Sequence, residues 1–170
     1  MEFQKLLKER HSIRVYQDKP VEEEKLNQIL EEARSAPSAG NLQAYKICVV
    51  KDKKAREKIA EAANQEFVAQ APVVLVFLQD PNQSSQKYNR RGEELYSLQD
   101  ATIACAYAQL AAADLGLGSV WVGAFDEEEV AKIIGVPSNL RPIAILPIGY
   151  PAEKPAAKSH RPLDELVWEK

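Results

Sequence analysis

Two arginines, a histidine and a serine fall within five residues, at positions 10–14, of this 170-residue chain. In an extended backbone, successive side chains point to opposite faces, so Arg10, Ser12 and Arg14 share one face. Paired guanidinium donors beside a hydroxyl suit a phosphate or a carboxylate ligand. Taken alone, the pattern also describes a solvated strand edge, and the rest of the chain must separate the two interpretations.

A second polar stretch, residues 37–43, has the small and turn-forming residues of a loop. Its small side chains allow a flat ligand to approach closely, and Asn41 and Gln43 carry carboxamides that donate and accept hydrogen bonds. An ordinary connecting turn has a similar composition. A β-rich run, 45–50, follows at once, so the loop is expected to lead into a central strand.

A second basic cluster lies near the C-terminus and contains Lys158, His160 and Arg161. Prolines predict that the segment from residue 151 onward is extended. Apolar residues follow the cluster at 163–168, and such a tail requires a surface on which to bury them. Simple solvent exposure remains the alternative interpretation of the basic residues.

Apolar periodicity predicts the elements that must position these residues. Helices are expected at 3–9, 22–35, 53–63, 93–115 and 126–134, and strands at 45–50, 72–78, 119–123 and 142–149. The polar segment 79–92 is expected to be a surface loop, with a rim for an anionic cosubstrate as the second interpretation. The helix 93–115 is alanine-rich and apolar nearly all round, which favours cover by a second subunit.

Composition narrows the class of protein. A net charge of −3 disfavours general nucleic-acid binding, and neither a signal core nor a membrane-length apolar run occurs. Cys48 and Cys105 have no CxxC spacing and are expected to be buried, reduced thiols of a cytoplasmic protein. His11 and His160 lack ligand spacing, which disfavours a metal site. No nucleophile or general base stands out, so a bound cofactor is expected to carry any chemistry.

Three segments in order resemble the FMN-dependent nitroreductase family: RHSIR at 10–14, PSAGNLQAY at 37–45 and GLGSVWVGAFDEEEVAKIIGVP at 116–137. The runs 143–151 and 158–167 fit as well. The resemblance implies an α+β fold in which helices flank a mostly antiparallel central sheet. It also implies one FMN-binding domain over 1–170 and an intertwined homodimer, with residues 151–170 as a tail that embraces the partner subunit.

The resemblance assigns the cofactor-binding positions residue by residue. Arg10 and Ser12 match positions that bind the FMN phosphate, with His11 beside them. Arg14 matches the cation near N1 of the flavin, where it would raise the reduction potential. The family loop that holds the flavin ring is matched by Ser38, Ala39, Asn41 and Gln43. Part of this loop is implied to reach across to the partner's flavin. Val122 and Gly123 match the backbone beside N5, and Lys158, His160 and Arg161 match the tail cluster over the phosphate.

Two positions depart from the family pattern. His160 stands where arginine is common, and Ala44 stands where proline is usual. The first departure implies weaker or pH-dependent phosphate binding, and the second leaves the shape of the loop open.

The activity that the resemblance implies is NADH- or NADPH-dependent hydride transfer through FMN to a flat small-molecule acceptor, such as a nitroaromatic or a quinone, by a ping-pong sequence. Catalytic side chains are not expected, because the flavin carries the chemistry and Arg14 tunes it. Two alternatives remain open. One is another flavin reaction of the superfamily, such as reductive dehalogenation or flavin breakdown, and the other is a non-catalytic flavin-binding dimer.

Overall fold

A computed structural model describes residues 2–155 and 159–170 of the chain. The helices are α1 (Phe3–Glu9), α2 (Glu23–Arg34), α3 (Lys53–Ala63), α4 (Phe67–Gln70), α5 (Pro81–Arg91), α6 (Ser97–Asp114) and α7 (Glu127–Ile134). The strands are β1 (Tyr45–Val50), β2 (Val73–Gln79), β3 (Gly118–Ser119) and β4 (Arg141–Gly149). Two 3-10 turns, Ala39–Asn41 and Leu163–Glu165, and a π-helical turn, Gly92–Tyr96, complete the set.

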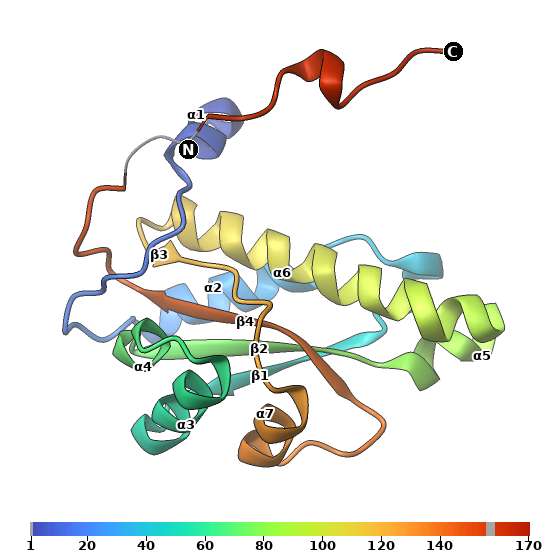
Figure 1. Cartoon of the computed structure of the whole chain (residues 1–170), viewed down its shortest axis with the longest axis horizontal. Helices are drawn as coiled ribbons and strands as arrows, with labels where there is room; N and C mark the ends of the chain where they lie inside the picture. The colour runs from blue at the N-terminus through green and yellow to red at the C-terminus, as the bar shows by residue number, and fades with distance from the viewer. Residues whose placement is uncertain (1, 156–158) are drawn as a thin grey trace.

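The four strands form one sheet in the order β1-β2-β4-β3, and every pair is antiparallel. Helices α2 and α6 lie on one face of this sheet, and α3 and α7 lie on the other (Figure 1). The expected α+β class with an antiparallel sheet between helices is therefore confirmed.

Alternate residues of β2 supply both halves of the core. Leu75 and Phe77 pack in the cluster with α2 and α6, whereas Val74 and Val76 pack in the cluster with α3 and α7. This division follows from the two-residue period of a strand. A strand covered on both faces is apolar throughout, as the sequence of β2 predicts.

The expectation that 45–50 is a central strand is wrong, because β1 lies at the edge of the sheet and β2 and β4 occupy its middle. A β-rich composition indicates that the side chains pack on a pleated, covered surface. It does not show whether a strand has one neighbouring strand or two. The strand expected at 119–123 is also shorter than predicted. Only Gly118–Ser119 forms β3, and Val122 makes an isolated bridge to Ile145.

The expected loop at 79–92 is largely the helix α5. Asp80 caps it, because its carboxylate accepts a hydrogen bond from the Gln83 N–H at 3.1 Å, and Pro81 occupies the first turn. An Asp-Pro pair is a helix-start signal that outweighs the polar composition of the segment. The π-helical turn then joins α5 to α6, so the expected helix at 93–115 begins with a distorted turn.

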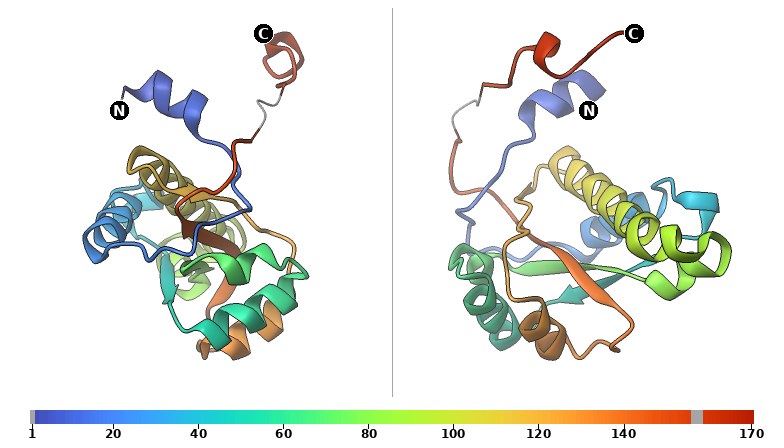
Figure 2. Two further views of the ribbon diagram at one scale, coloured as in Figure 1. Left: turned by 90° about the vertical axis from the view of Figure 1, so that its left-hand side faces the viewer. Right: turned by 45° about the vertical axis from the view of Figure 1, so that its right-hand side comes forward.

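The two terminal segments run side by side where they leave the sheet. The Gln17 N–H donates to the Tyr150 carbonyl at 2.9 Å, and the Ala152 N–H donates to the Val15 carbonyl at 2.9 Å. Beyond this pairing, α1 and the C-terminal segment project away from the body (Figures 1 and 2). Among the described helices, none combines the length and the apolar character needed to span a membrane.

Candidate functional site

The basic segment 10–14 is extended and lies against β3. The Ile13 N–H donates to the Ser119 carbonyl at 3.0 Å, and Ser12 forms a parallel bridge with Ser119. Ile13 is buried, and a Cβ at Gly118 would lie 2.8 Å from its side chain. The missing side chain of Gly118 therefore makes room for Ile13, which turns the neighbouring Ser12 and Arg14 away from the core.

Tyr16 fixes the end of the basic segment. It is buried, and its hydroxyl donates to the Ile13 carbonyl at 2.7 Å. Burial raises the pKa of Tyr16 far above its ordinary value, while the nearby Arg14 works in the opposite direction. The phenol therefore stays protonated and keeps this hydrogen bond. Val15 is exposed beside it, so the strict two-residue alternation ends after Arg14.

The side chains of Arg10 and Arg14 form no ion pair within the described residues. Arg14 is exposed, with its guanidinium 5.9 Å from the centroid of the Phe67 ring, while Arg10, His11 and Ser12 are half-buried. Guanidinium groups without a carboxylate partner keep their donors for a ligand. This arrangement supports an anion receptor over a neutralised strand edge.

The 37–43 segment is a tight turn with an unusual backbone. Gly40, Asn41 and Gln43 have positive φ angles of 57°, 58° and 49°. The Gln43 N–H donates to Ser38 Oγ at 3.0 Å, and Gln43 Nε2 donates to Asn41 Oδ1 at 3.1 Å. The two carboxamides thus brace one another. The side-chain nitrogen of Asn41 and the side-chain oxygen of Gln43 retain hydrogen-bonding capacity for the edge of a flat heterocycle.

Asp100, in the first turn of α6, is a site residue that the sequence analysis missed. Its carboxylate accepts hydrogen bonds from the Ala39 N–H at 2.9 Å and from the Ala44 N–H at 3.2 Å. Burial raises the pKa of Tyr45, and the negative charge of Asp100 nearby raises it further. An acid directly before the alanine-rich part of this helix was the available signal for this residue.

The structure places the basic segment and the 37–43 turn at opposite ends of α6 (Figure 1). Asp100, which holds the turn, lies near the start of this helix, and Gly118, which contacts Ile13, follows its end. At 1.5 Å per residue, the helix between Asp100 and Asp114 spans roughly 20 Å. Arg10, Ser12 and Arg14 therefore do not meet the turn residues within one chain.

Val122 and Gly123 follow β3 along the chain, and β3 is the strand that contacts the basic segment through Ser119. Val122 is buried, and it exchanges two backbone hydrogen bonds of 2.9 Å with Ile145. Gly123 is exposed, and a Cβ there would lie 3.4 Å from Trp121 Nε1, the nearest atom apart from those of its two chain neighbours. This backbone is therefore anchored at Val122 and open at Gly123.

The tail cluster is only partly described. Lys158 lies outside the described residues. His160 and Arg161 are exposed, and Arg161 Nε lies 3.0 Å from the Glu165 carboxylate. Within the described residues, neither is hydrogen-bonded or ion-paired to the basic segment 10–14. The structure of a single chain therefore does not bring the two basic clusters into contact.

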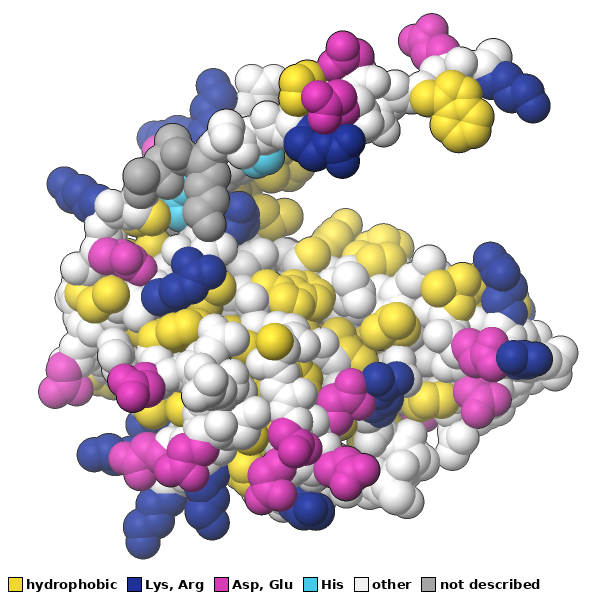
Figure 3. Space-filling view, in the orientation of Figure 1, with side chains coloured by type: hydrophobic (Ala, Val, Ile, Leu, Met, Phe, Trp, Pro, Cys, Tyr) yellow, Lys and Arg dark blue, Asp and Glu magenta, His cyan; other side chains and the backbone are white. Residues whose placement is uncertain are grey.

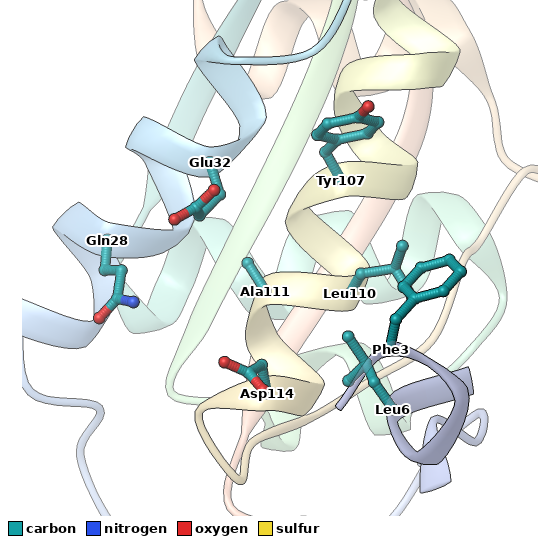
Figure 4. A pocket seen from close by; sticks show the side chains of 8 residues that line it. All are labelled: Phe3, Leu6, Gln28, Glu32, Tyr107, Leu110, Ala111 and Asp114. Atoms are coloured by element: carbon teal, nitrogen blue, oxygen red, sulfur yellow. The ribbon is translucent and has the colours of Figure 1, made fainter. Parts of the chain in front are cut away.

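An apolar groove of about 470 Å³ lies where α1, α2 and α6 meet. Phe3 and Leu6 of α1 point toward Leu110 of α6, with Tyr107 farther along the same helix (Figure 4). The tail stands clear of the body, and hydrophobic side chains are visible on the surface below it (Figure 3). Both the groove and the tail thus offer apolar surface that a folded chain normally covers.

Known proteins resemble this chain in sequence and in fold. The profile of the Nitroreductase family matches residues 7–67 and 60–150. An FMN reductase (NAD(P)H) of Bacillus subtilis is 37% identical over 176 residues, which cover 95% of this chain and 71% of that protein. An NADH dehydrogenase of Thermus thermophilus is 35% identical, covering 93% of this chain and 91% of its own length.

A solved structure extends the likeness to three dimensions. A nitroreductase family protein from Clostridium difficile 630 superposes with a TM-score of 0.88 at 35% identity, and the match covers 99% of this chain and 98% of that one. The match in sequence and the match in fold thus both cover nearly the whole of this chain. The chain belongs to the nitroreductase family.

Proposed function

We propose that this protein is an NAD(P)H-dependent FMN oxidoreductase that delivers electrons to a flat acceptor, such as a nitroaromatic or a quinone, in a ping-pong sequence. The observation that carries the proposal is that, among the described residues, the side chains of Arg10 and Arg14 in the extended segment beside β3 form no ion pair. Relatives that are named for FMN and nicotinamide substrates support the choice of cofactor and donor.

The residues of the chain fit FMN at both of its ends. Arg10 and Ser12, with His11 beside them, present charged and hydroxyl donors suited to the phosphate. The turn at 38–43 has small side chains, and Asn41 and Gln43 offer one donor group and one acceptor group for the polar edge of the ring. FMN, when bound, supplies the hydride-accepting and hydride-donating chemistry that no side chain here provides.

The side chains have separate tasks in this proposal. Arg10 and Ser12 anchor the phosphate, with His11 beside them, and Lys158, His160 and Arg161 of the tail close over it. Arg14 places positive charge beside the ring, while Ser38, Ala39, Asn41 and Gln43 orient the ring. The open backbone at Gly123, which is fixed by the Val122 bridge to β4, lies beside the reacting edge.

The protein is proposed to act as a homodimer, with one domain over 1–170 and with residues 151–170 embracing the partner. A span of roughly 20 Å along α6 separates the two parts of the site, which is too far for one flavin to contact both parts of the same chain at close range. A second copy would bring its own turn to the basic segment of the first. It would also cover the exposed Leu163, Leu166 and Trp168 of the tail.

The first experiment tests the cofactor and the activity. We expect the purified protein to bind FMN with a yellow colour and to be bleached by NADH or NADPH without oxygen, then reoxidised by a nitroaromatic or a quinone. Arg10→Ala should weaken binding of FMN far more than binding of riboflavin, which has no phosphate. A protein that takes up no added FMN would contradict the proposal.

The second experiment tests whether the turn serves the partner's flavin. Arg10→Ala and Asn41→Ala chains with different tags are co-expressed, and the mixed dimer is purified through both tags. If each site combines the basic segment of one chain with the turn of the other, both substitutions fall in one site and the other site is intact. Such a dimer keeps one flavin of wild-type affinity, whereas sites built within single chains would leave none.

A further inference from the structure

We propose that Asp100 is a positioning residue that sets the shape of the turn 38–44, an inference that rests on the function proposed above. Asp100 is 1% exposed and projects from the first turn of α6. Its Oδ1 accepts a hydrogen bond from the Ala39 N–H at 2.9 Å, and its Oδ2 accepts one from the Ala44 N–H at 3.2 Å. One carboxylate thus holds both ends of the turn.

The cost of burying this acid is offset by the turn. Asp100 forms no ion pair with lysine, arginine or histidine within the described residues. A carboxylate removed from water is strongly disfavoured unless hydrogen bonds replace its hydration. The two hydrogen bonds that do so come from Ala39 and Ala44, so the acid and the turn depend on one another.

The backbone of the turn requires such support. Positive φ angles are disfavoured for residues with a side chain, and Asn41 and Gln43 adopt them at 58° and 49°. Among the described residues of the turn, one side chain hydrogen-bonds to the backbone of Gln43. This is Ser38, whose hydroxyl oxygen accepts from the Gln43 N–H. The carboxylate of Asp100 adds a hydrogen bond at each end of the turn. The Ser38 and Asp100 hydrogen bonds together stabilise the backbone conformation.

Asp100 acts on the flavin through the turn and does not contact it. The N–H groups of Ala39 and Ala44 are directed at the buried carboxylate, so they are engaged on the side of α6. Asn41 and Gln43 lie between these two anchors and carry the carboxamides that would meet the ring. Loss of Asp100 should therefore weaken contacts to the ring and leave contacts to the phosphate unchanged.

The test begins with Asp100→Asn, which keeps the side-chain volume and replaces one acceptor oxygen with an amide nitrogen, which donates hydrogen bonds and cannot accept one. We expect FMN and riboflavin affinities to fall by the same factor, about tenfold or more, since a hydrogen bond to a charged group is lost. The FMN-to-riboflavin affinity ratio should stay at the wild-type value. The visible absorption band of the bound flavin should shift, because its ring contacts change.

A second variant, Ala39→Pro, removes one donor and leaves α6 intact. Ser38 has φ −138° and ψ 157°, which is the extended backbone that a residue before proline prefers. Position 39 begins a 3-10 turn, where proline is compatible with the backbone. The same equal loss of FMN and riboflavin affinity is expected, so the inference does not depend on whether Asp100→Asn folds.

The matched control is Ser97→Ala, in the same turn of α6. Ser97 is buried and its Oγ donates to the Glu93 carbonyl at 3.0 Å, with no bond to the turn. This variant should melt at a lower temperature with unchanged flavin affinity and spectrum. If Asp100→Asn and Ala39→Pro behave like this control, the positioning role is refuted.

A readout without flavin separates this inference from the proposed function. Amide hydrogen exchange over residues 38–45 of the flavin-free, full-length protein should be faster in Asp100→Asn and Ala39→Pro than in wild type or Ser97→Ala. Unchanged exchange in both variants overturns the inference. A wild-type protein that binds no flavin would refute the proposed function, and the exchange result would still decide whether Asp100 holds the turn.

Discussion

Arg10 and Arg14 share one short segment, yet their surroundings differ, and so do the tasks that we propose for them. Arg10 is half-buried near the end of α1, while Arg14 is exposed above the ring of Phe67. Glu153 holds the backbone of this part of the segment, because its carboxylate accepts hydrogen bonds from the N–H groups of Arg14 and Val15 at 2.5 Å and 3.1 Å. Glu153 contacts the backbone of Arg14, and the Arg14 side chain forms no ion pair within the described residues.

Arg14→Ala is expected to lower the reduction potential of bound FMN while much of the affinity remains. A nearby cation stabilises the negative charge of the reduced ring, and its loss at an effective dielectric constant of about 20 costs roughly 1–3 kcal/mol. For a two-electron couple this corresponds to about 20–65 mV. The potential is measured by spectroscopic titration against a reference dye.

Arg14→Lys and Arg10→Ala are the comparison variants for this measurement. The lysine keeps a positive charge and should restore most of the potential. Arg10→Ala should weaken FMN binding and leave the potential of the bound flavin near that of the wild type. Equal potentials in wild type and Arg14→Ala would remove the proposed electronic role.

The two cysteines are expected to be poor nucleophiles. Desolvation by burial raises the pKa of the Cys105 thiol far above its ordinary value, and it raises the pKa of Cys48 in the same direction. The thiolate is the reactive form, so both residues should react slowly at neutral pH. A thiol-reactive dye should label native protein slowly at Cys48 and label Cys105 only after unfolding, with Cys48→Ser identifying each signal. Rapid native labelling of Cys105 would contradict its buried environment.

Individual elements show which features the sequence can predict. The bounds of β1, α3 and α7 follow from apolar periodicity, and the Asp126 cap of α7 is present, with the Glu129 N–H at 2.9 Å from its carboxylate. Helix α5 was missed because its residues are polar, although its Asp-Pro start is a local signal. The edge position of β1 has no local signal, since strand order depends on pairings distant in sequence.

The site shows the same limit. The types of residue at 10–14 and 38–43 identify groups suited to an anion and to a flat ring, but spacing along the chain cannot show that α6 separates them. Asp100 was overlooked for a related reason, because its partners Ala39 and Ala44 lie 61 and 56 residues away. Residue types within one segment can be read from the sequence, and the role they suggest stays a prediction. Contacts between segments distant in sequence, such as those of Asp100, cannot be read in this way.

The contact between β3 and the basic segment gives a prediction at the level of elements. Gly118→Ala would place a Cβ 2.8 Å from the Ile13 side chain, which must then move with the neighbouring Ser12 and Arg14. Overpacking of this kind costs about 1–3 kcal/mol of unfolding free energy. We also expect FMN to bind more weakly relative to riboflavin, as measured by fluorescence titration, because the phosphate end is displaced.

Gly92→Ala provides matched crowding at the opposite end of α6. A Cβ there would lie 2.5 Å from the Ser84 carbonyl oxygen, in the contact between α5 and the π-helical turn. This variant should lose comparable stability and retain the wild-type ratio of FMN to riboflavin affinity. If both glycine variants change the ratio equally, the effect is general destabilisation and not displacement of the phosphate end.

At the scale of the whole molecule, the pairing of the two terminal segments connects the candidate site to the tail that is proposed to contact a partner chain. Residues 15–17 pair with residues 150–152, so the basic segment and the start of the tail form one structural unit. The tail then leaves the body with Trp168 86% exposed. An apolar side chain of this size, together with the groove where α1, α2 and α6 meet, gives the surface that a partner chain would cover.

Truncation after Pro155 tests this assembly while it preserves the pairing of the terminal segments. The shortened chain keeps Ala152 and Glu153, which bond to Val15 and Arg14, so the basic segment should stay in place. It loses the apolar tail and the basic cluster that contains His160 and Arg161. We therefore expect a weaker dimer by light scattering, and weaker binding of FMN.

A full-length chain with Leu166→Ser and Trp168→Ser separates the two contributions of the tail. Both side chains are exposed in the single chain, so their replacement should leave the fold of the subunit intact. It should weaken the dimer while it retains the basic residues, and FMN affinity should then rise with protein concentration as the dimer reforms. A truncated protein that stays dimeric with full FMN affinity would refute the role proposed for the tail. Weak FMN binding by a stable truncated dimer would assign the effect to the basic cluster alone.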